Sequence, residues 1–232
     1  MLESFYCLDN DIILKLTAYN LFNDTLNSLE IDHTQVKILD TFKYKFGKQI
    51  KRKRTEKVNN KLTHNDIKKA LEITKKYVTV SEHNLENIDL DIYAKLENYS
   101  KISQDKDNKI DKGEAILISH VCYLNQQGQS NYLLTGDKRC LRALTNSGFT
   151  YILVHLEGKI WCLEQLILKN IEQFGFDYVQ SKIYQAQDCD TNIKLIFGYS
   201  EKLAEEIVQE SFKSEIMTLK KETGKLLYPY PN

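Results

Sequence analysis

Residues 112–154 read KGEAILISHVCYLNQQGQSNYLLTGDKRCLRALTNSGFTYILV, and their pattern decides the fold class. Apolar residues first recur at the spacing of a helix and then form a short continuous run, as in a buried strand. This pair of features occurs twice, with glycines in the turns between them. Alternating helices and strands with short connections are typical of a parallel sheet covered by helices. We therefore predict an α/β fold, with helices over 112–125 and 138–146 and strands over 131–135 and 149–154.

The same alternation extends toward the N-terminus. Residues 26–42 fit either a helix or a helix followed by a strand, and this choice stays open. Thr63 is a plausible N-cap, with Asp66 at the capping-box position. Short apolar runs predict strands over 4–8 and 77–80, and helical spacing predicts helices over 12–22, 63–75 and 88–102.

The pattern changes after the strand predicted at 149–154. Residues 160–174 and 200–221 show amphipathic helical spacing, and no further strand is predicted. We therefore divide the chain into a parallel-sheet domain at 1–155 and a helical C-terminal extension at 156–232. Apolar helical stripes usually face inward, so we expect the extension to pack on the core, with partner binding as the alternative.

Composition argues against several classes of protein. The 232 residues carry 32 basic and 32 acidic side chains, so the net charge points to no particular partner. Five scattered cysteines without a C-x-x-C pair favour reduced thiols, and the histidines lack the spacing of a zinc site. No apolar stretch is long enough to span a bilayer, and no signal peptide is evident. We expect a cytoplasmic protein without a membrane partner.

Three acidic residues stand where a parallel sheet gathers ligand-binding groups. Asp9 ends the first strand, Asp137 follows the strand at 131–135, and Glu114 opens the helix at 112–125. The carboxyl ends of parallel strands face one crevice, and clustered carboxylates repel one another unless a hard cation such as Mg²⁺ or Mn²⁺ neutralises them. We therefore predict a site for such a cation. Each acid also fits an ordinary helix cap, Asp111 and Glu114 as a D-x-x-E capping box, and this alternative stays open.

The residues around these acids resemble the motifs of PIN-domain nucleases. Residues 8–14 (LDNDIIL) are similar to the first-strand motif of that family, and residues 113–117 (GEAIL) to its Gly-Glu-Ala helix start. Residues 133–139 (LLTGDKR) resemble its Leu-Leu-Thr-x-Asp strand end. The three motifs stand in the order of the family and span roughly residues 4–155. The resemblance implies a three-layer α/β/α PIN-like domain.

The resemblance also implies roles for individual side chains. Asp9, Glu114 and Asp137 would hold the metal and act as the catalytic acids, and Asp11 would support Asp9 through hydrogen bonds. Thr135 fits either a hydroxyl that holds water or phosphate, or an ordinary β-branched strand residue. The fourth acid that the family commonly has stays open between Asp111, Glu82 and Glu86.

Basic residues supply two candidate contacts for a nucleic-acid backbone. Lys138 and Arg139 begin a predicted helix, where a phosphate meets free N–H groups, although ordinary solvated charge explains them equally well. Residues 43–57 read KYKFGKQIKRKRTEK, in which Tyr44 and Phe46 could stack on unpaired bases. The dense cluster within this stretch, which could bind phosphates by charge alone, is Lys51, Arg52, Lys53 and Arg54.

Together these features predict hydrolysis of phosphodiester bonds with the help of Mg²⁺ or Mn²⁺. The resemblance implies an endonuclease acting on RNA in preference to DNA. Many small PIN proteins are toxins of toxin–antitoxin or antiphage systems, so an inhibitory or effector protein partner is expected by analogy, and a homo-oligomer stays open. The alternative is a non-catalytic PIN-like scaffold that binds nucleic acid or protein.

Overall fold

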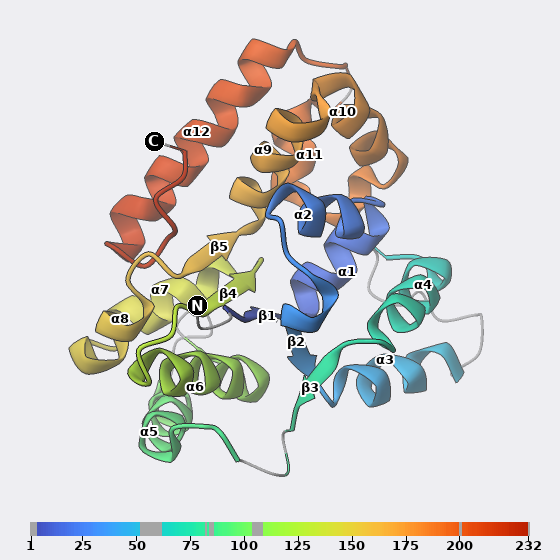
Figure 1. Cartoon of the computed structure of the whole chain (residues 1–232). Coiled ribbons are helices and arrows are strands. Elements are labelled where there is room, and N and C mark those ends of the chain that lie inside the picture. Colours follow the sequence, from blue (N-terminus) through green and yellow to red (C-terminus); the bar gives the residue numbers. More distant parts are fainter. Residues whose placement is uncertain are drawn as a thin grey trace.

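Five parallel strands form one sheet in the computed structural model, which describes residues 4–51, 62–81, 83, 86–103, 109–199 and 201–231, without the side chains of 49–51. Their order is β3-β2-β1-β4-β5, and each neighbouring pair is parallel (Figure 1). This arrangement confirms the predicted α/β fold with a parallel sheet. The strands are β1 (Tyr6–Leu8), β2 (Val36–Leu39), β3 (Val78–Val80), β4 (Tyr132–Thr135) and β5 (Ile160–Cys162).

Helices lie on both faces of this sheet, consistent with a three-layer α/β/α arrangement (Figure 1). Two short 3-10 helices accompany them within the described ranges, η1 (His33–Gln35) and η2 (Gln187–Cys189). The α-helices of the described ranges are α1 (Asn10–Ala18), α2 (Phe22–Ser28), α3 (Phe42–Lys51), α4 (His64–Thr74), α5 (Leu90–Ile102), α6 (Lys112–Gln126), α7 (Lys138–Asn146), α8 (Thr150–Leu156), α9 (Leu163–Phe174), α10 (Phe176–Gln185), α11 (Thr191–Phe197) and α12 (Glu205–Thr223).

β1 lies at the centre of the sheet, and strands are added first on one side of it and then on the other. From β1 the chain adds β2 and β3 on one side, and it then returns to place β4 and β5 on the other. Leu8 of β1 pairs with Leu134 of β4, so both strands end at the same edge. Crevices at such reversal points are where open parallel sheets bind ligands.

Local sequence signals explain where several helices begin. The predicted capping box at α4 is present, since Asp66 N donates to Thr63 Oγ1 (3.2 Å) and Thr63 N donates to Asp66 Oδ2 (2.9 Å). Asp9, Asp111 and Asp137 are the N-caps of α1, α6 and α7. The starts of these four helices therefore follow capping chemistry.

Two predicted elements near residue 155 are wrong. Residues 149–154 form no strand, because Thr150 to Leu156 make up α8. The fifth strand is instead Ile160–Cys162, the start of a stretch predicted as helix. All three of its residues are buried, and its apolar run continues without a break into α9, so the sequence pattern carries no boundary between them. The sheet thus extends past residue 155, while the division into two domains stays a prediction.

The remaining C-terminal residues pack against the sheet layers as predicted. Asn170 of α9 donates to the Thr25 hydroxyl of α2 (2.8 Å), and both side chains are buried. The final segment runs beside β5, with Tyr228 N donating to Ile160 O (2.7 Å). The open choice for 26–42 is also settled, as α2, η1 and β2 follow one another there.

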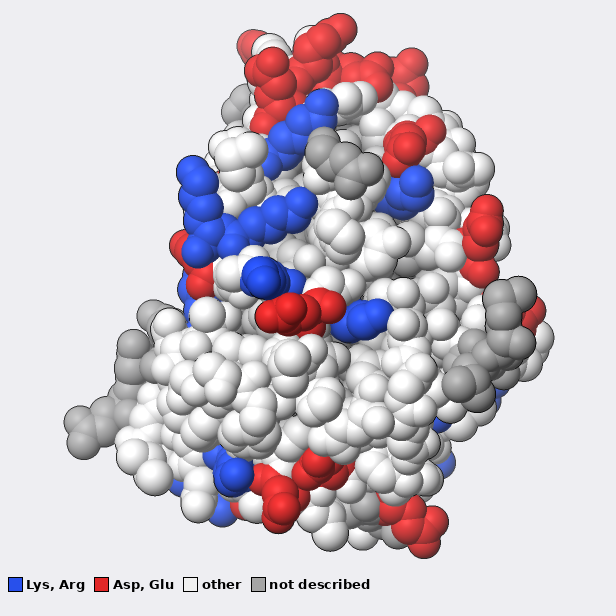
Figure 2. Space-filling model, turned by 60° about the vertical axis from the view of Figure 1, so that its left-hand side comes forward, with Lys and Arg blue, Asp and Glu red and all other residues white. Residues whose placement is uncertain are grey.

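The face of the molecule in Figure 2 carries both acidic and basic side chains. Acidic side chains crowd the end of the molecule where α12 begins, and lysines and arginines lie below them on the same face (Figure 2). Along α12 itself, Glu205 and Glu206 lie in the first turn and Lys220 and Lys221 in the last, which suits the helix dipole. Among the described residues, no helix has both the length and the apolar character needed to cross a bilayer.

Candidate functional site

The carboxyl edge of the sheet brings Asp9 and Asp137 to one place. Asp9 N donates to Leu134 O (3.0 Å), which continues the β1–β4 pairing by one residue and sets Asp9 beside Thr135. The Thr135 hydroxyl makes a long hydrogen bond to Asp9 Oδ2 (3.4 Å) and accepts one from Asp137 N (3.1 Å). One buried threonine therefore links two acids that are far apart in the sequence, and it does more than fill a strand position.

Glu114 joins this group from the first turn of α6. It is only 7% exposed, and its Oε2 accepts a hydrogen bond from Asp111 N (2.7 Å). The charges of Glu114, Asp9 and Asp137 all act on the buried Cys140 thiol of α7, whose pKa is raised first by burial and then by these three charges. The three predicted acids thus lie near one buried thiol, and we call them the acid cluster (Asp9, Glu114 and Asp137).

Two carboxyl groups of the acid cluster are held in a setting that disfavours their charge. Burial raises the pKa of Asp9 to about 7, and the charges of Asp11, Asp111 and Asp137 contribute. Burial likewise raises the pKa of Glu114 to about 9, with contributions from Asp111, Asp9 and Asp137. Desolvation and like charges act in the same direction here, as expected of carboxylates that lack a counter-ion.

Asp137 differs because it has a cationic partner. Burial raises its pKa, but hydrogen bonds and charge from Arg139 outweigh this effect and hold the pKa below its ordinary value. Arg139 Nη2 lies 2.8 Å from Asp137 Oδ2, and the arginine side chain is 61% exposed. Asp137 Oδ1 also accepts from Arg139 N (2.8 Å) and Cys140 N (3.2 Å). Asp137, whose lowered pKa favours its charged form, is therefore paired with the exposed Arg139.

These acids cap helices and also lie near one another at the carboxyl edge of the sheet. Asp9, Asp111 and Asp137 cap their helices, and Glu114 completes the capping box of α6. Asp111 is exposed at the rim of the cluster, and its charge raises the pKa of both Asp9 and Glu114. Of the other candidates for a fourth acid, Glu86 is exposed in the loop before α5, and Glu82 lies outside the described residues.

The acid cluster has the chemistry of a hard-cation site, but its oxygens are not converged. Within the described part of the chain, no three His, Cys, Asp or Glu side chains come together as a formed metal centre. Hydrogen bonds occupy one oxygen of Glu114 and both oxygens of Asp9, and the Asp137 carboxylate pairs with Arg139. Carboxylate oxygens and one hydroxyl are nevertheless the ligands that Mg²⁺ and Mn²⁺ accept. Binding would require rotation of side chains, foremost of Arg139.

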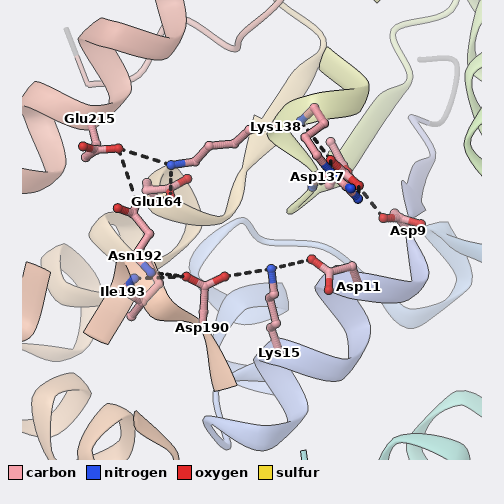
Figure 3. A network of polar contacts seen from close by, with 12 residues as sticks. Asp9, Asp11, Lys15, Asp137, Lys138, Glu164, Asp190, Asn192, Ile193 and Glu215 are labelled. Carbon is pink, nitrogen blue, oxygen red and sulfur yellow. Dashed lines mark hydrogen bonds and ion pairs between the residues drawn. The ribbon is translucent and has the colours of Figure 1, made fainter. Parts of the chain in front are cut away.

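Two lysines beside the acid cluster are held by carboxylates from the C-terminal residues (Figure 3). Lys138 Nζ lies 2.7 Å from Oε1 of the buried Glu164 and 3.2 Å from Glu215 Oε2. Lys15 Nζ lies 2.5 Å from Asp11 Oδ2 and 2.8 Å from Asp190 Oδ2. Asp11 therefore pairs with Lys15 and makes no described hydrogen bond to Asp9, which corrects the support expected from it. Its charge instead raises the pKa of Asp9.

A cavity of about 360 Å³ opens beside these lysines, and it reaches the acid cluster at Asp137. Gly136 forms part of its wall, and a Cβ there would lie 2.6 Å from Asp11 Oδ2, so a larger residue would displace that carboxylate. The cavity is large enough for a phosphodiester group and its neighbouring sugar. Its further lining residues include Asp137, Lys138, Arg139, Glu164, Asp190 and Asn192.

The basic residues predicted to bind nucleic acid have differing positions. Lys138 and Arg139 both bind carboxylates of the protein, as described above. Phe46 is buried against Phe42, with ring centroids 4.8 Å apart, and so has no face to offer a base. Tyr44 is 59% exposed. The Lys51 side chain and residues 52–54 (Arg52, Lys53 and Arg54) lie outside the described residues.

Sequence reasoning missed three residues at this site. Glu164 follows the strand that was itself missed, although Ile-Trp-Cys-Leu-Glu repeats the pattern of a strand followed by an acid. Lys15 carried a signal in its i,i+4 spacing from Asp11. Asp190 caps α11 by accepting from Asn192 N (2.9 Å), and nothing in the sequence ties it to Lys15.

Comparison of the chain with protein-family models, with curated proteins and with solved structures finds no match.

Proposed function

We propose that this protein is a divalent-cation-dependent nuclease that hydrolyses phosphodiester bonds at the acid cluster. The observation that carries the proposal is the meeting of Asp9 and Asp137 at Thr135, with Glu114 near both acids, at the reversal point of a parallel sheet. Ligand sites of such sheets lie at this crevice. The resemblance to PIN-domain motifs, carried by the same three acids, supports the assignment and favours RNA over DNA as substrate.

The charge of the acid cluster supports a cation at this place. Asp9 and Glu114 are buried with raised pKa values, so a nearby cation would favour their charged forms. A bound Mg²⁺ or Mn²⁺ would supply Lewis-acid activation of the phosphodiester group and of water. Asp9, Glu114 and Asp137 would hold it, with Asp111 as the proposed fourth acid.

The protein's own groups would position the substrate in the adjoining cavity. Asp11 lies against Gly136, and Lys15 pairs with Asp190. These two contacts hold part of the cavity wall in place. Arg139 lines the same cavity beside Asp137, and its guanidinium has the chemistry to hold a substrate phosphate. The same resemblance underlies a role as a toxin or antiphage effector restrained by a protein partner.

A non-catalytic scaffold is the second candidate, and the Arg139–Asp137 pair favours it. In a scaffold this pair (2.8 Å) would permanently take the place of a cation by neutralising one of the three acids. Such a protein would bind nucleic acid or protein without cleaving it. The two candidates therefore differ in whether divalent cations change the behaviour of the site.

Cleavage of labelled single-stranded RNA and DNA by the purified protein in Mn²⁺, Mg²⁺ or EDTA tests the proposal. Asp9→Asn should abolish cation-dependent cutting. Asp32→Asn is the matched control, because Asp32 is an exposed N-cap before β2 and Asn caps equally well, so it should cut like the wild type. No cutting by folded protein in any metal would favour the scaffold. Hydrolysis of mononucleotides without cutting of polymers would indicate a phosphatase instead.

A further inference from the structure

A second cavity lies at the opposite edge of the sheet from the acid cluster. Its volume is about 560 Å³, within the range of small-molecule sites. Tyr6 and Tyr132, the paired first residues of β1 and β4, line it, whereas the acids follow the last residues of these strands. At about 3.3 Å per residue the two sites are roughly 10 Å apart along the strands. We call it the aromatic pocket (Tyr6, Tyr132, Trp161, Tyr228 and Tyr230).

The C-terminal segment is fastened in place as one wall of the aromatic pocket. Leu227 bridges to Ile160 of β5. The buried Gln165 side chain donates to Tyr228 O (2.8 Å) and to Tyr230 O, and its Oε1 accepts from Cys162 N (3.1 Å). A wall held by a buried side chain and a strand-like pairing is a built part of the fold and gives the pocket a fixed shape.

The rings of the aromatic pocket form two stacked pairs. Tyr6 stacks on Tyr132 with ring centroids 5.0 Å apart, and Trp161 stacks on Tyr228 at 4.3 Å. Tyr132 meets Tyr228 edge to face at 6.0 Å, which joins the two pairs. Such walls suit a flat aromatic ligand, because stacking of a base on an aromatic side chain is favourable for every base.

Three phenol groups add polar recognition to these walls. The phenol groups of Tyr6, Tyr132 and Tyr228 belong to neighbouring rings, with centroids 5.0 Å apart for Tyr6 and Tyr132 and 6.0 Å apart for Tyr132 and Tyr228. The hydrogen bonds of the described residues include none from these three hydroxyls, whereas the Tyr230 hydroxyl donates to Glu172 (3.0 Å). Neutral hydroxyls without a protein partner favour a ligand with hydrogen-bonding groups over a purely apolar one.

Lys169 brings a positive charge to the lining of the aromatic pocket, and Lys159 lies near one of its rings. Lys159 Nζ lies 5.2 Å from the Tyr132 ring centroid, and Lys169 Nζ lies 5.3 Å from that of Tyr230. Lys169 also pairs with Glu172 (3.0 Å), an exposed contact that a phosphate can displace. The exposed Glu30 completes the lining and can accept from the amino group of a base. A flat ring, hydrogen-bonding groups and a negative charge together describe a nucleotide.

We propose that the aromatic pocket binds a free nucleoside monophosphate, with its base against the tyrosine and tryptophan rings and its phosphate at Lys169. The site is separate from the acid cluster and does not depend on the proposed nuclease activity. Its place on β1, β4 and β5 would let an occupant act on the strands whose opposite ends carry the acids.

Calorimetric titration of the full chain with AMP, GMP and UMP in EDTA tests this proposal, because EDTA prevents binding through a metal at the acid cluster. Trp161 is the single tryptophan of the chain, so its fluorescence reports the same pocket in parallel. We expect Lys169→Met to weaken monophosphate binding about tenfold, since a charged hydrogen bond is lost. Tyr6→Phe, which keeps the ring, should weaken binding several-fold.

Lys194→Met is the matched control, because Lys194 lies 4.1 Å from the Tyr199 ring centroid in a similar pair outside the pocket. It should bind the monophosphates like the wild type. Lack of binding by the wild type, with its fold verified by circular dichroism, would overturn the proposal. So would equal affinity in all variants, or binding of oligonucleotides without binding of monophosphates. Cleavage activity enters none of these outcomes, so the proposed nuclease function stands or fails separately.

Discussion

Replacing Asp9 by Asn should stabilise the metal-free protein, although it removes a charge from the proposed active site. The folded-state pKa of Asp9 is raised from an ordinary 3.8 to about 7, so folding opposes ionisation of this carboxyl. The sign follows from proton linkage: the penalty is absent below the unfolded pKa of about 4 and complete above the folded pKa. At about pH 8 the full penalty is about 4 kcal/mol, on the scale of roughly 1.4 kcal/mol per pKa unit.

Relaxation of a coupled cluster reduces this figure, so we expect a gain of about 1–3 kcal/mol for Asp9→Asn. Asn also keeps the cap of α1, since it accepts from the same backbone N–H groups. For a chain of this length the gain corresponds to roughly 3–10 °C in Tm. The assay is thermal unfolding in EDTA at about pH 8 and again at about pH 4, where the difference between the two proteins should nearly vanish.

Asp137→Asn is the internal control, because the same chemical change should have the opposite sign there. Arg139 holds the pKa of Asp137 below its ordinary value, so its charge stabilises the fold above the unfolded pKa. We expect a loss of about 1 kcal/mol at neutral pH. Destabilisation by Asp9→Asn in EDTA at high pH would refute the electrostatic account of the cluster.

Three further experiments test two ion pairs beside the acid cluster and the contact that holds the C-terminal segment. Lys138→Met leaves the buried Glu164 without its cation and should cost about 3 kcal/mol in urea unfolding, whereas adding Glu164→Gln should restore most of the loss. Burial raises the pKa of Asp190, but the ion pair with Lys15 outweighs this effect and holds the pKa below its ordinary value. The resulting stability is present above an unfolded pKa of about 4 and is lost as the pH falls further. Asp190→Asn should therefore make the free energy of unfolding depend less on pH in acid. Gln165→Leu should release the C-terminal segment, seen as faster amide exchange at 226–231, at a cost of about 2 kcal/mol.

Much of the fold follows from short-range signals in the sequence. The strand at 131–135 and the helix at 138–146 are found within a residue or two, because apolar runs, glycine turns and capping residues agree there. The capping box at Thr63 is equally local. The meeting of Asp9 with Asp137 followed from the rule that parallel strands end at one edge.

The errors arise where tertiary contacts decide the local structure. β5 has three residues and gains its identity from pairing with β4 and the C-terminal segment, so its sequence cannot be told from the start of α9. The stretch at 149–154 is rich in strand-forming residues but folds as α8 against α6. Because β5 was not predicted, Glu164 was not recognised as an acid that follows a strand. Its ion pair with Lys138 was missed for the same reason.

Titration of the metal-free protein with Mn²⁺ by calorimetry tests most directly whether the acid cluster is a cation site. The wild type and the remote control Asp32→Asn should bind Mn²⁺ alike, and Asp9→Asn and Asp137→Asn should lose that binding, because each removes one of the charged ligands. Equal Mn²⁺ affinity in the wild type and in Asp9→Asn would contradict the account, as would the absence of binding in all four proteins.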